Sequence, residues 1–231
     1  MASELQSPAA CVTASATDYT NLPNGCTISL YGNTFTLKSF QYASLVLEGY
    51  RYVDPDDVQV TPFSGSGQIG IGVTSTNFSV SSISGPPRLV VKFEYILDPP
   101  PPILEDLSMD MEANSPLFPG FANIHTEVCA GAEFIENDCG QYGTYRSFDL
   151  DHLGYEDGDP RNILSGRVTF PATWFIDVRT TITLDANGGS SQIDGFRYAS
   201  APTPEPATAV LVMCAVGVGA WLRRRRRAQG C

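Results

Sequence analysis

The chain has 231 residues and a formal net charge of −11, a length that suits one domain with an appendage. Its 25 acidic residues outnumber 14 basic ones, which excludes a general nucleic-acid binder, because such a protein needs a basic surface. Five arginines stand near the end of the chain, whereas residues 1–206 hold nine basic and 25 acidic groups, a formal charge of −16. We therefore interpret the chain as an acidic body, residues 1–200, followed by a separate basic tail, residues 201–231.

Alternation of apolar and polar side chains runs through the body, whereas helical periodicity is scarce. The predicted strands are, in chain order, Thr27–Tyr31, Thr34–Tyr42, Val58–Pro62, Gln68–Val73, Asn77–Ser82, Arg88–Leu97, Ile103–Ala113, Asn123–Cys129, Thr144–Leu150, Arg167–Phe170, Trp174–Asp185 and Gln192–Tyr198. In the eleventh, the alternation puts Trp174 and Ile176 on a buried face and Asp177 on a wet face. Turn residues separate the strands. This spacing predicts an all-β fold, an antiparallel β-sandwich or jelly-roll.

Four of the six cysteines lie in the body, at positions that suggest two local pairs. Cys11 and Cys26 are fifteen residues apart, and Cys129 and Cys139 are ten apart. Beside turn-rich sequence, such pairs predict two disulfides in an exported protein. Four free thiols in a cytosolic protein are the alternative. A zinc site has little support, because no C-x-x-C motif occurs.

Two groups of body residues are candidates for binding. Clustered carboxylates can hold Ca²⁺, although solvated loops are the favoured interpretation. The candidates are Asp149, Asp151, Asp157 and Asp159, with a smaller group at Asp54, Asp56 and Asp57. Exposed aromatic rings can stack on sugars, although packing in the core or at a sheet edge is favoured. The candidates are Tyr50, Tyr52, Tyr142, Tyr145 and Tyr155.

The tail contains an uncharged segment, residues 207–222, that leads directly into five arginines. These are Arg223, Arg224, Arg225, Arg226 and Arg227. A bilayer span usually needs about 20 apolar residues, and arginine stems lengthen a short span by snorkelling. We predict a transmembrane helix over residues 207–222. The positive-inside rule places the arginines in the cytoplasm and the body outside. A buried helix of a soluble domain is the alternative.

Pro204, Glu205 and Pro206 stand just before this segment. A Pro-Glu-Pro triplet, a short apolar helix and an arginine cluster, in this order, resemble the PEP-CTERM sorting signal of exported bacterial proteins. The resemblance implies that a membrane-embedded exosortase recognises residues 204–206 and cuts the chain near them. The body then passes to the cell surface or the exopolysaccharide matrix. Family members often have a longer, leucine-rich span, whereas this one is rich in Gly, Ala and Val.

Export of the body also requires an N-terminal signal peptide. Residues 1–8 show neither a basic start nor an apolar run. We therefore expect a leader upstream of Met1, or one already removed. A tail-anchored protein with a cytosolic body is the alternative, which the arginine cluster and the cysteine pairs both oppose.

Catalytic motifs are absent from the sequence. It contains no G-x-S-x-G, H-E-x-x-H, P-loop or dinucleotide-binding fingerprint, and its two histidines, His125 and His152, form no recognisable triad pattern. The sequence favours a non-catalytic, exported surface or matrix protein without a cofactor, with Ca²⁺ as the alternative to no bound ion. A carbohydrate-binding module for exopolysaccharide with the same sorting signal is the alternative. A secreted hydrolase is a third interpretation.

Overall fold

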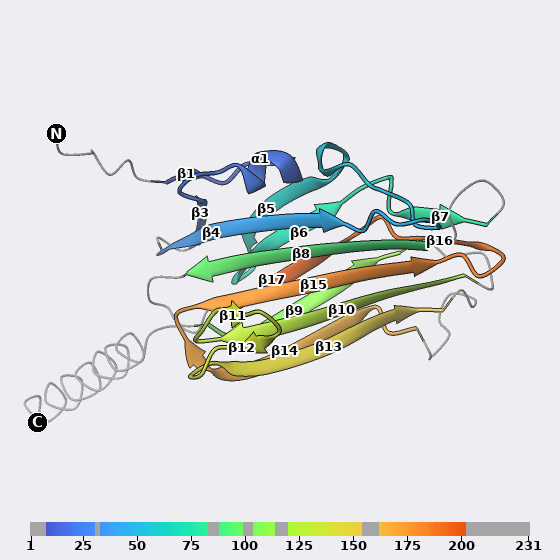
Figure 1. Ribbon diagram of the computed structural model, residues 1–231. Coiled ribbons are helices and arrows are strands. Elements are labelled where there is room, and N and C mark those ends of the chain that lie inside the picture. Colours follow the sequence, from blue (N-terminus) through green and yellow to red (C-terminus); the bar gives the residue numbers. More distant parts are fainter. Residues whose placement is uncertain are drawn as a thin grey trace, which may run out of the picture.

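The computed structural model describes residues 8–30, 33–82, 88–98, 104–113, 120–153 and 162–201, which form two stacked β-sheets (Figure 1). The seven-stranded sheet contains, in spatial order, β1 (Ala9–Ala10), β3 (Cys26–Leu30), β4 (Asn33–Ser44), β8 (Arg88–Asp98), β15 (Ile176–Asp185), β10 (Phe121–Ala130) and β13 (Thr144–His152). The six-stranded sheet contains β14 (Ser165–Thr173), β9 (Leu104–Glu112), β17 (Gly195–Ser200), β6 (Gln68–Thr74), β5 (Gln59–Gly65) and β2 (Ala14–Ser15).

Shorter elements complete the described part of the chain. They are the ribbon β11 (Phe134–Ile135) with β12 (Asp138–Cys139), the ribbon β7 (Ser79–Ser81) with β16 (Ser190–Gln192), the helix α1 (Ala16–Thr20) and the 3-10 turn Pro55–Asp57. Helix α1 begins with a capping box, in which Ser15 accepts from the Asp18 N–H and Asp18 accepts from the Ser15 N–H.

The all-β sandwich predicted from the alternation is confirmed, and each predicted strand overlaps a strand of the structure, Gln192–Tyr198 overlapping both β16 and β17. Neighbouring strands pair antiparallel, except that β1 pairs with β3 in parallel. No helix in the described ranges is long and apolar enough to cross a bilayer. The predicted span, residues 207–222, lies outside those ranges.

The hydrophobic core lies between the two sheets and follows from the period-2 pattern. On β8, Leu89, Val91, Phe93, Tyr95 and Leu97 are all buried, and the residues between them face outward. The Phe93 ring is central, because four aromatic rings lie within 6.2 Å of its centroid. Burying each such side chain stabilises the fold by about 1.5–3 kcal/mol.

The core also contains a polar group shared between the sheets. The Tyr198 hydroxyl of β17 bonds to the Thr180 hydroxyl of β15, and Thr180 Oγ1 lies 3.2 Å from Thr126 Oγ1 of β10. All three side chains are buried. Mutual hydrogen bonding offsets the cost of removing these hydroxyls from water.

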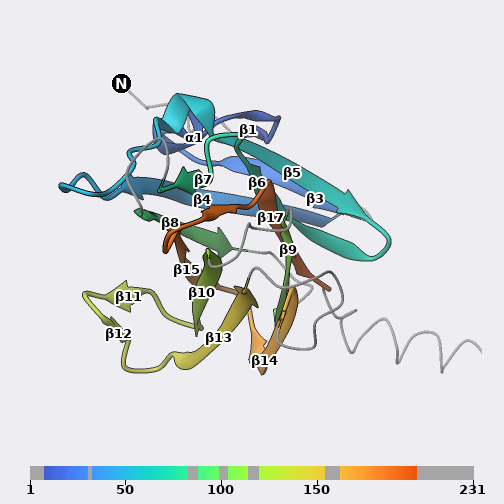
Figure 2. The same ribbon diagram turned by 90° about the vertical axis from the view of Figure 1, so that its right-hand side faces the viewer.

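The edges of the two sheets approach each other at β13 and β14, where Arg146 Nε donates to the Thr169 carbonyl at 3.1 Å. Figure 2 shows these strands at one side of the sandwich and α1 at the opposite side. Strand β17 lies in the interior of its sheet, between β9 and β6. Just after it, the Ala201 N–H donates to Asp106 Oδ1 at 3.0 Å.

Two residues of the Trp174–Asp185 prediction are placed differently by the structure. Trp174 is 61% exposed rather than buried, because β15 begins only at Ile176 and Trp174 lies in the turn after β14. Asp177 is 1% exposed rather than wet, because the chain segment that contains β11 covers it. Alternation identified the strand, but it could not indicate what lies on top of the sheet.

Candidate functional site

A row of polar side chains crosses the outer face of the seven-stranded sheet. Gln41 of β4 pairs with Glu94 of β8, which in turn pairs with Arg179 of β15. On its other side, Arg179 pairs with Glu127 of β10. The inner residues of these strands form the core, so this row faces away from it. Above the row is a hollow of about 270 Å³, whose lining also includes Lys92, Asn137 and Thr181.

Arg179 is the centre of this hollow, because it contacts both the sheet and the loop above it. Its Nε lies 3.1 Å from Glu94 Oε2, and its Nη2 donates to Glu94 Oε1 at 3.3 Å. Its Nη1 donates to the Glu136 carbonyl. The guanidinium carbon also lies 4.3 Å from the centroid of the Phe134 ring, within cation–π distance. Arg179 therefore fixes the loop on the sheet.

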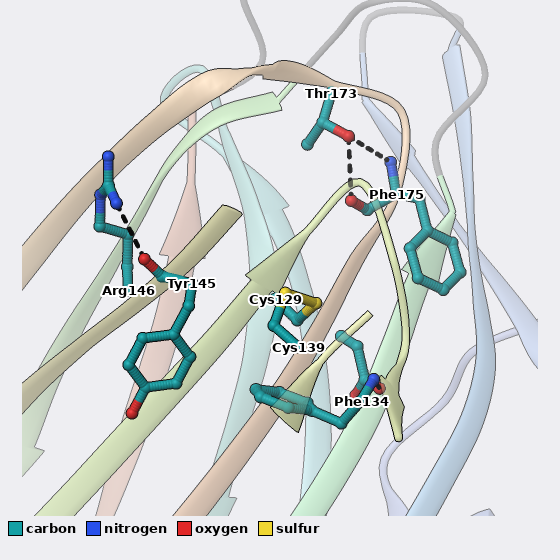
Figure 3. The surroundings of a disulfide bond; sticks show 8 residues. Cys129, Phe134, Cys139, Tyr145, Arg146, Thr173 and Phe175 are labelled. Atoms are coloured by element: carbon teal, nitrogen blue, oxygen red, sulfur yellow. Dashed lines mark hydrogen bonds between the residues drawn. A yellow bond between two sulfur atoms is a disulfide. The ribbon is translucent and has the colours of Figure 1, made fainter. Parts of the chain in front are cut away.

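We call residues 131–143 the disulfide loop, because the Cys129–Cys139 bond closes it onto β10 (Figure 3). Phe134 of this loop is buried, and its ring meets the Tyr145 ring edge-on with centroids 6.4 Å apart. Gly143 lies directly against the disulfide: a Cβ there would stand 2.4 Å from Cys139 Sγ and 2.7 Å from Cys129 Sγ. The loop supplies Asn137 to the hollow.

Asp177 holds the loop from below. Its Oδ2 accepts the Phe134 N–H at 2.9 Å. Burial raises the pKa of this carboxyl from its ordinary value of 3.8 to about 6; the Phe134 N–H opposes the rise, and the nearby Glu94 carboxylate adds to it. Because Asp177 is enclosed beneath the loop, we assign its shifted pKa to the structure rather than to chemistry on a ligand.

A second polar group lies beside the hollow, on β10 and β13. Tyr145 Oη donates to Glu127 Oε1 at 2.9 Å, and the Tyr145 residue is 44% exposed. Farther along the same strands, His125 Nδ1 lies 2.8 Å from Asp149 Oδ1. The hollow and its rim thus combine carboxylates, amides, a guanidinium, an ammonium and a phenol. Groups of this kind donate and accept hydrogen bonds in fixed directions.

The cysteine prediction is confirmed, since both Cys11–Cys26 and Cys129–Cys139 are disulfides. The aromatic candidates divide: Tyr52, Tyr142 and Tyr145 are exposed, Tyr50 is half-buried, and Tyr155 lies outside the described residues.

The acidic candidates lie in different settings. Asp149 and Asp151 are on strand β13 rather than in a loop, and Asn123 Nδ2 donates to Asp151 Oδ1 at 2.9 Å. Asp157 and Asp159 lie outside the described residues. Within the described ranges, no group of three or more His, Cys, Asp or Glu could hold a metal ion.

The smaller acidic group caps the 3-10 turn. Asp54 Oδ1 accepts the Asp56 N–H at 3.0 Å, and Asp57 Oδ2 accepts from Asn77 Nδ2 at 2.8 Å. Of the two histidines, His125 lies on the outer face of the sheet and His152 is buried. The sorting motif at residues 204–206 and the arginines at 223–227 lie outside the described residues.

Sequence reasoning missed the hollow. Its residues come from four strands and one loop that are far apart in the chain, and each alone resembles an ordinary polar side chain of a strand. The one available signal was the Cys129–Cys139 spacing, which predicted a closed loop but not where the loop lies.

Comparisons with known proteins give only distant likenesses. No protein-family model matches the chain, and neither does any curated protein. Among solved structures, TmCBM61 in complex with β-1,4-galactotriose is similar at 12% identity and a TM-score of 0.34, over 69% of this chain and 86% of that one. A carbohydrate-binding module structure described as from the β-sandwich superfamily shares 11% identity with a TM-score of 0.20, over 85% of this chain and 62% of that one. The enzymatically active domain of bacteriophage CBA120 tailspike protein 4 shares 10% identity with a TM-score of 0.25, over 68% of this chain and 19% of that one.

Proposed function

We propose that the chain is a non-catalytic exported protein that its C-terminal signal delivers to the cell surface or the extracellular matrix. The observation that carries this proposal is the pairing of all four body cysteines as two disulfides. Disulfides persist in oxidising compartments and are rare in the cytosol. In this proposal the PEP-CTERM-like tail is the sorting signal. The formal charge of −16 on residues 1–206 suits a soluble component of a hydrated matrix.

The end of the sandwich favours access to the sorting motif. The last described hydrogen bond of the chain is the one from the Ala201 N–H to Asp106, and Pro204 follows three residues later. Prolines keep a segment extended and outside a helix. In this proposal the exosortase reads residues 204–206 while residues 207–222 hold the chain in the membrane and the arginines stay in the cytoplasm.

Fractionation of cells with and without an exosortase tests this function. Only in the host with the enzyme do we expect the mass of the mature protein to correspond to a chain that ends near residues 204–206. We expect Glu205→Ala to prevent this cleavage. Glu112→Ala, an exposed acidic residue of β9, is the matched control and should be processed normally. A cytosolic product with residues 207–231 intact in both hosts would contradict the proposal.

A second candidate function, binding of exopolysaccharide, is favoured by the chemistry of the hollow. Sugar hydroxyls both donate and accept hydrogen bonds, and the hollow offers partners of both kinds in Gln41, Lys92 and Asn137. Tyr145 adds a partly exposed ring at the rim. In this proposal Arg179 and Glu94 maintain the shape of the hollow rather than bind the sugar, because the two side chains already form an ion pair with each other.

Affinity electrophoresis in gels that contain the exopolysaccharide tests the second function. We expect Gln41→Ala and Lys92→Ala to weaken retention, whereas Asp110→Ala, exposed on the outer face of the other sheet, leaves it unchanged. Equal mobility of all variants with and without polysaccharide would rule out binding at this site.

The same samples test the hydrolase interpretation. Glu94 and Glu127 are the carboxylates of the hollow, and release of reducing ends that Glu127→Gln abolishes would overturn the non-catalytic proposal.

A further inference from the structure

Exposed aromatic side chains gather at the end of the sandwich where β15 begins, which is at the left in Figure 1. Trp174 is 61% exposed and Tyr142 is 89% exposed. Ile135 of the disulfide loop is 67% exposed. Large apolar side chains in this state contribute little to the fold, because they remain in water. We call this end, defined by Trp174 and Tyr142, the aromatic end.

Trp174 and Tyr142 belong to two segments that both lie beside Gly131. The Gly131 N–H donates to the Phe175 carbonyl at 2.9 Å. A Cβ placed on Gly131 would stand 3.5 Å from Thr173 Oγ1 and 3.9 Å from the Tyr142 carbonyl oxygen. Figure 3 shows the Thr173–Phe175 turn beside the Cys129–Cys139 disulfide, where two hydrogen bonds between Thr173 and Phe175 shape the turn that presents Trp174.

The chain leaves the sandwich at this same end. Thr173 of β14 pairs with Leu104 of β9, and two residues farther along β9, Asp106 accepts the Ala201 N–H. Trp174 and Ala201 therefore flank the same short piece of β9. Sequence places the exit point and the aromatic residues far apart, but the sheet register joins them.

The sequence after Ala201 limits how far this end can stand from a membrane. Five residues, 202–206, precede the apolar segment that starts at Ala207. An extended chain covers at most about 3.3–3.6 Å per residue, so this five-residue tether spans at most about 18 Å. Trp and Tyr are the side chains that concentrate at membrane–water interfaces, because each has an apolar ring and a polar atom.

We propose that, before the chain is cut, the aromatic end lies on the outer surface of the bilayer that holds residues 207–222, with Trp174 and Tyr142 in the interface. The proposal rests on the sorting function proposed above. Glu105, Glu133, Glu136 and Asp138 are exposed near this end, so contact with anionic lipid is unfavourable. Adhesion through two rings is therefore weak without the tether, as single membrane signals generally are, and cleavage releases the body.

The chain has two tryptophans, Trp174 and Trp221, and this allows a direct test on the full-length protein. The chain is reconstituted in phosphatidylcholine vesicles with brominated acyl chains. In a Trp221→Phe chain we expect Trp174 emission to shift to the blue and to lose intensity to the bromines. In a Trp174→Phe chain, Trp221 reports whether the tail inserts. Vesicles with added phosphatidylglycerol should quench Trp174 less.

The control moves the probe to the other end of the sandwich. Val46 is 70% exposed and follows the end of β4, so a Val46→Trp chain without the native tryptophans should emit as in water. Quenching of Trp221 without quenching of Trp174 overturns the docking inference alone, whereas absence of quenching at both rejects membrane insertion itself. Iodide quenches tryptophans that are exposed to water. If exopolysaccharide protected Trp174 from iodide and brominated lipid did not quench it, the aromatic end would be a sugar-binding surface, and the inference would also be overturned.

Discussion

Asp177 accepts a hydrogen bond from the main-chain N–H of Phe134 at 2.9 Å. This bond joins a buried carboxyl of the seven-stranded sheet to the disulfide loop. The residues are 43 positions apart. The arrangement leaves an ionisable group in a place that favours its neutral form, because burial opposes its charge more than the hydrogen bond supports it.

Asp177→Asn should stabilise the protein at neutral pH. The pKa of Asp177 in the fold, about 6, exceeds its ordinary value of 3.8, so ionisation opposes folding. The contribution of this residue to stability is therefore most favourable below about pH 4, declines as pH rises to about 6 and stays low above that. Asparagine keeps the acceptor without the charge, and the gain at pH 7 is at most about 3 kcal/mol.

Urea unfolding of both chains at pH 7 and pH 4 measures this difference. The gain should nearly vanish at pH 4, where the carboxyl of the folded protein is already protonated. Asp110→Asn, on an exposed residue, is the control and should change stability by less than about 0.5 kcal/mol at either pH. An Asp177→Asn chain that is less stable at pH 7 would contradict the sign of this effect.

The two disulfides should have similar effects on stability and different effects on ligand binding. Each closes a short loop, so replacing either cysteine pair by serine costs about 3 kcal/mol on the chain-entropy model. Only the Cys129–Cys139 pair anchors the loop that brings Asn137 to the hollow. We expect Cys129→Ser with Cys139→Ser to lose retention by polysaccharide, and Cys11→Ser with Cys26→Ser to keep it. Equal retention of the two double variants would mean that the loop plays no part in the site.

Gly143→Ala should destabilise the protein. The new methyl group meets both sulfurs of the disulfide at under 3 Å, and overpacking of this kind costs about 1–3 kcal/mol. Thermal unfolding compares it with Gly65→Ala, where no atom lies within 4 Å of the added Cβ. If both variants melt together, the sulfurs have room to move aside.

The hydroxyls of Tyr198 and Thr180 should be energetically coupled. We expect Tyr198→Phe to cost about 1 kcal/mol, and a double-mutant cycle with Thr180→Val to return a coupling of about 0.5–1.5 kcal/mol. A second cycle, of Tyr198→Phe with Thr181→Val, is the control and should return a coupling near zero. Thr181 lines the hollow on the opposite face of the same strand. A coupling near zero in the first cycle would show that the two hydroxyls do not stabilise each other in solution.

Much of the sandwich could be predicted from local sequence, because the alternation of apolar and polar side chains indicates which face of a strand is exposed to solvent. Leu89, Val91 and Phe93 illustrate this, since their spacing alone placed them in the core. The two-residue strands and the five-residue helix escaped prediction, because so few residues show no period. The cysteine pairs were predicted correctly, because short spacing leaves few partners.

The candidate site could not be predicted in this way, because it depends on contacts between distant segments. Arg179 alternates as an outward residue should, but nothing near it in sequence shows that Phe134 covers it or that Glu94 pairs with it. The predictions for Asp177 and Trp174 were wrong for different reasons. The disulfide loop covers Asp177, whereas Trp174 lies before the first residue of its strand.

The place of β17 in its sheet sets the order in which the protein is completed. This strand is the last described in the chain, yet it pairs on both sides, with β9 and with β6. Until residues 195–200 have been synthesised, the six-stranded sheet is two separate pieces, β14 with β9 and β6 with β5 and β2, whose open edges are liable to pair with other chains. The sandwich therefore closes only when synthesis has nearly reached Ala201. A chain that stops a few residues earlier leaves β9 and β6 without the strand that joins them.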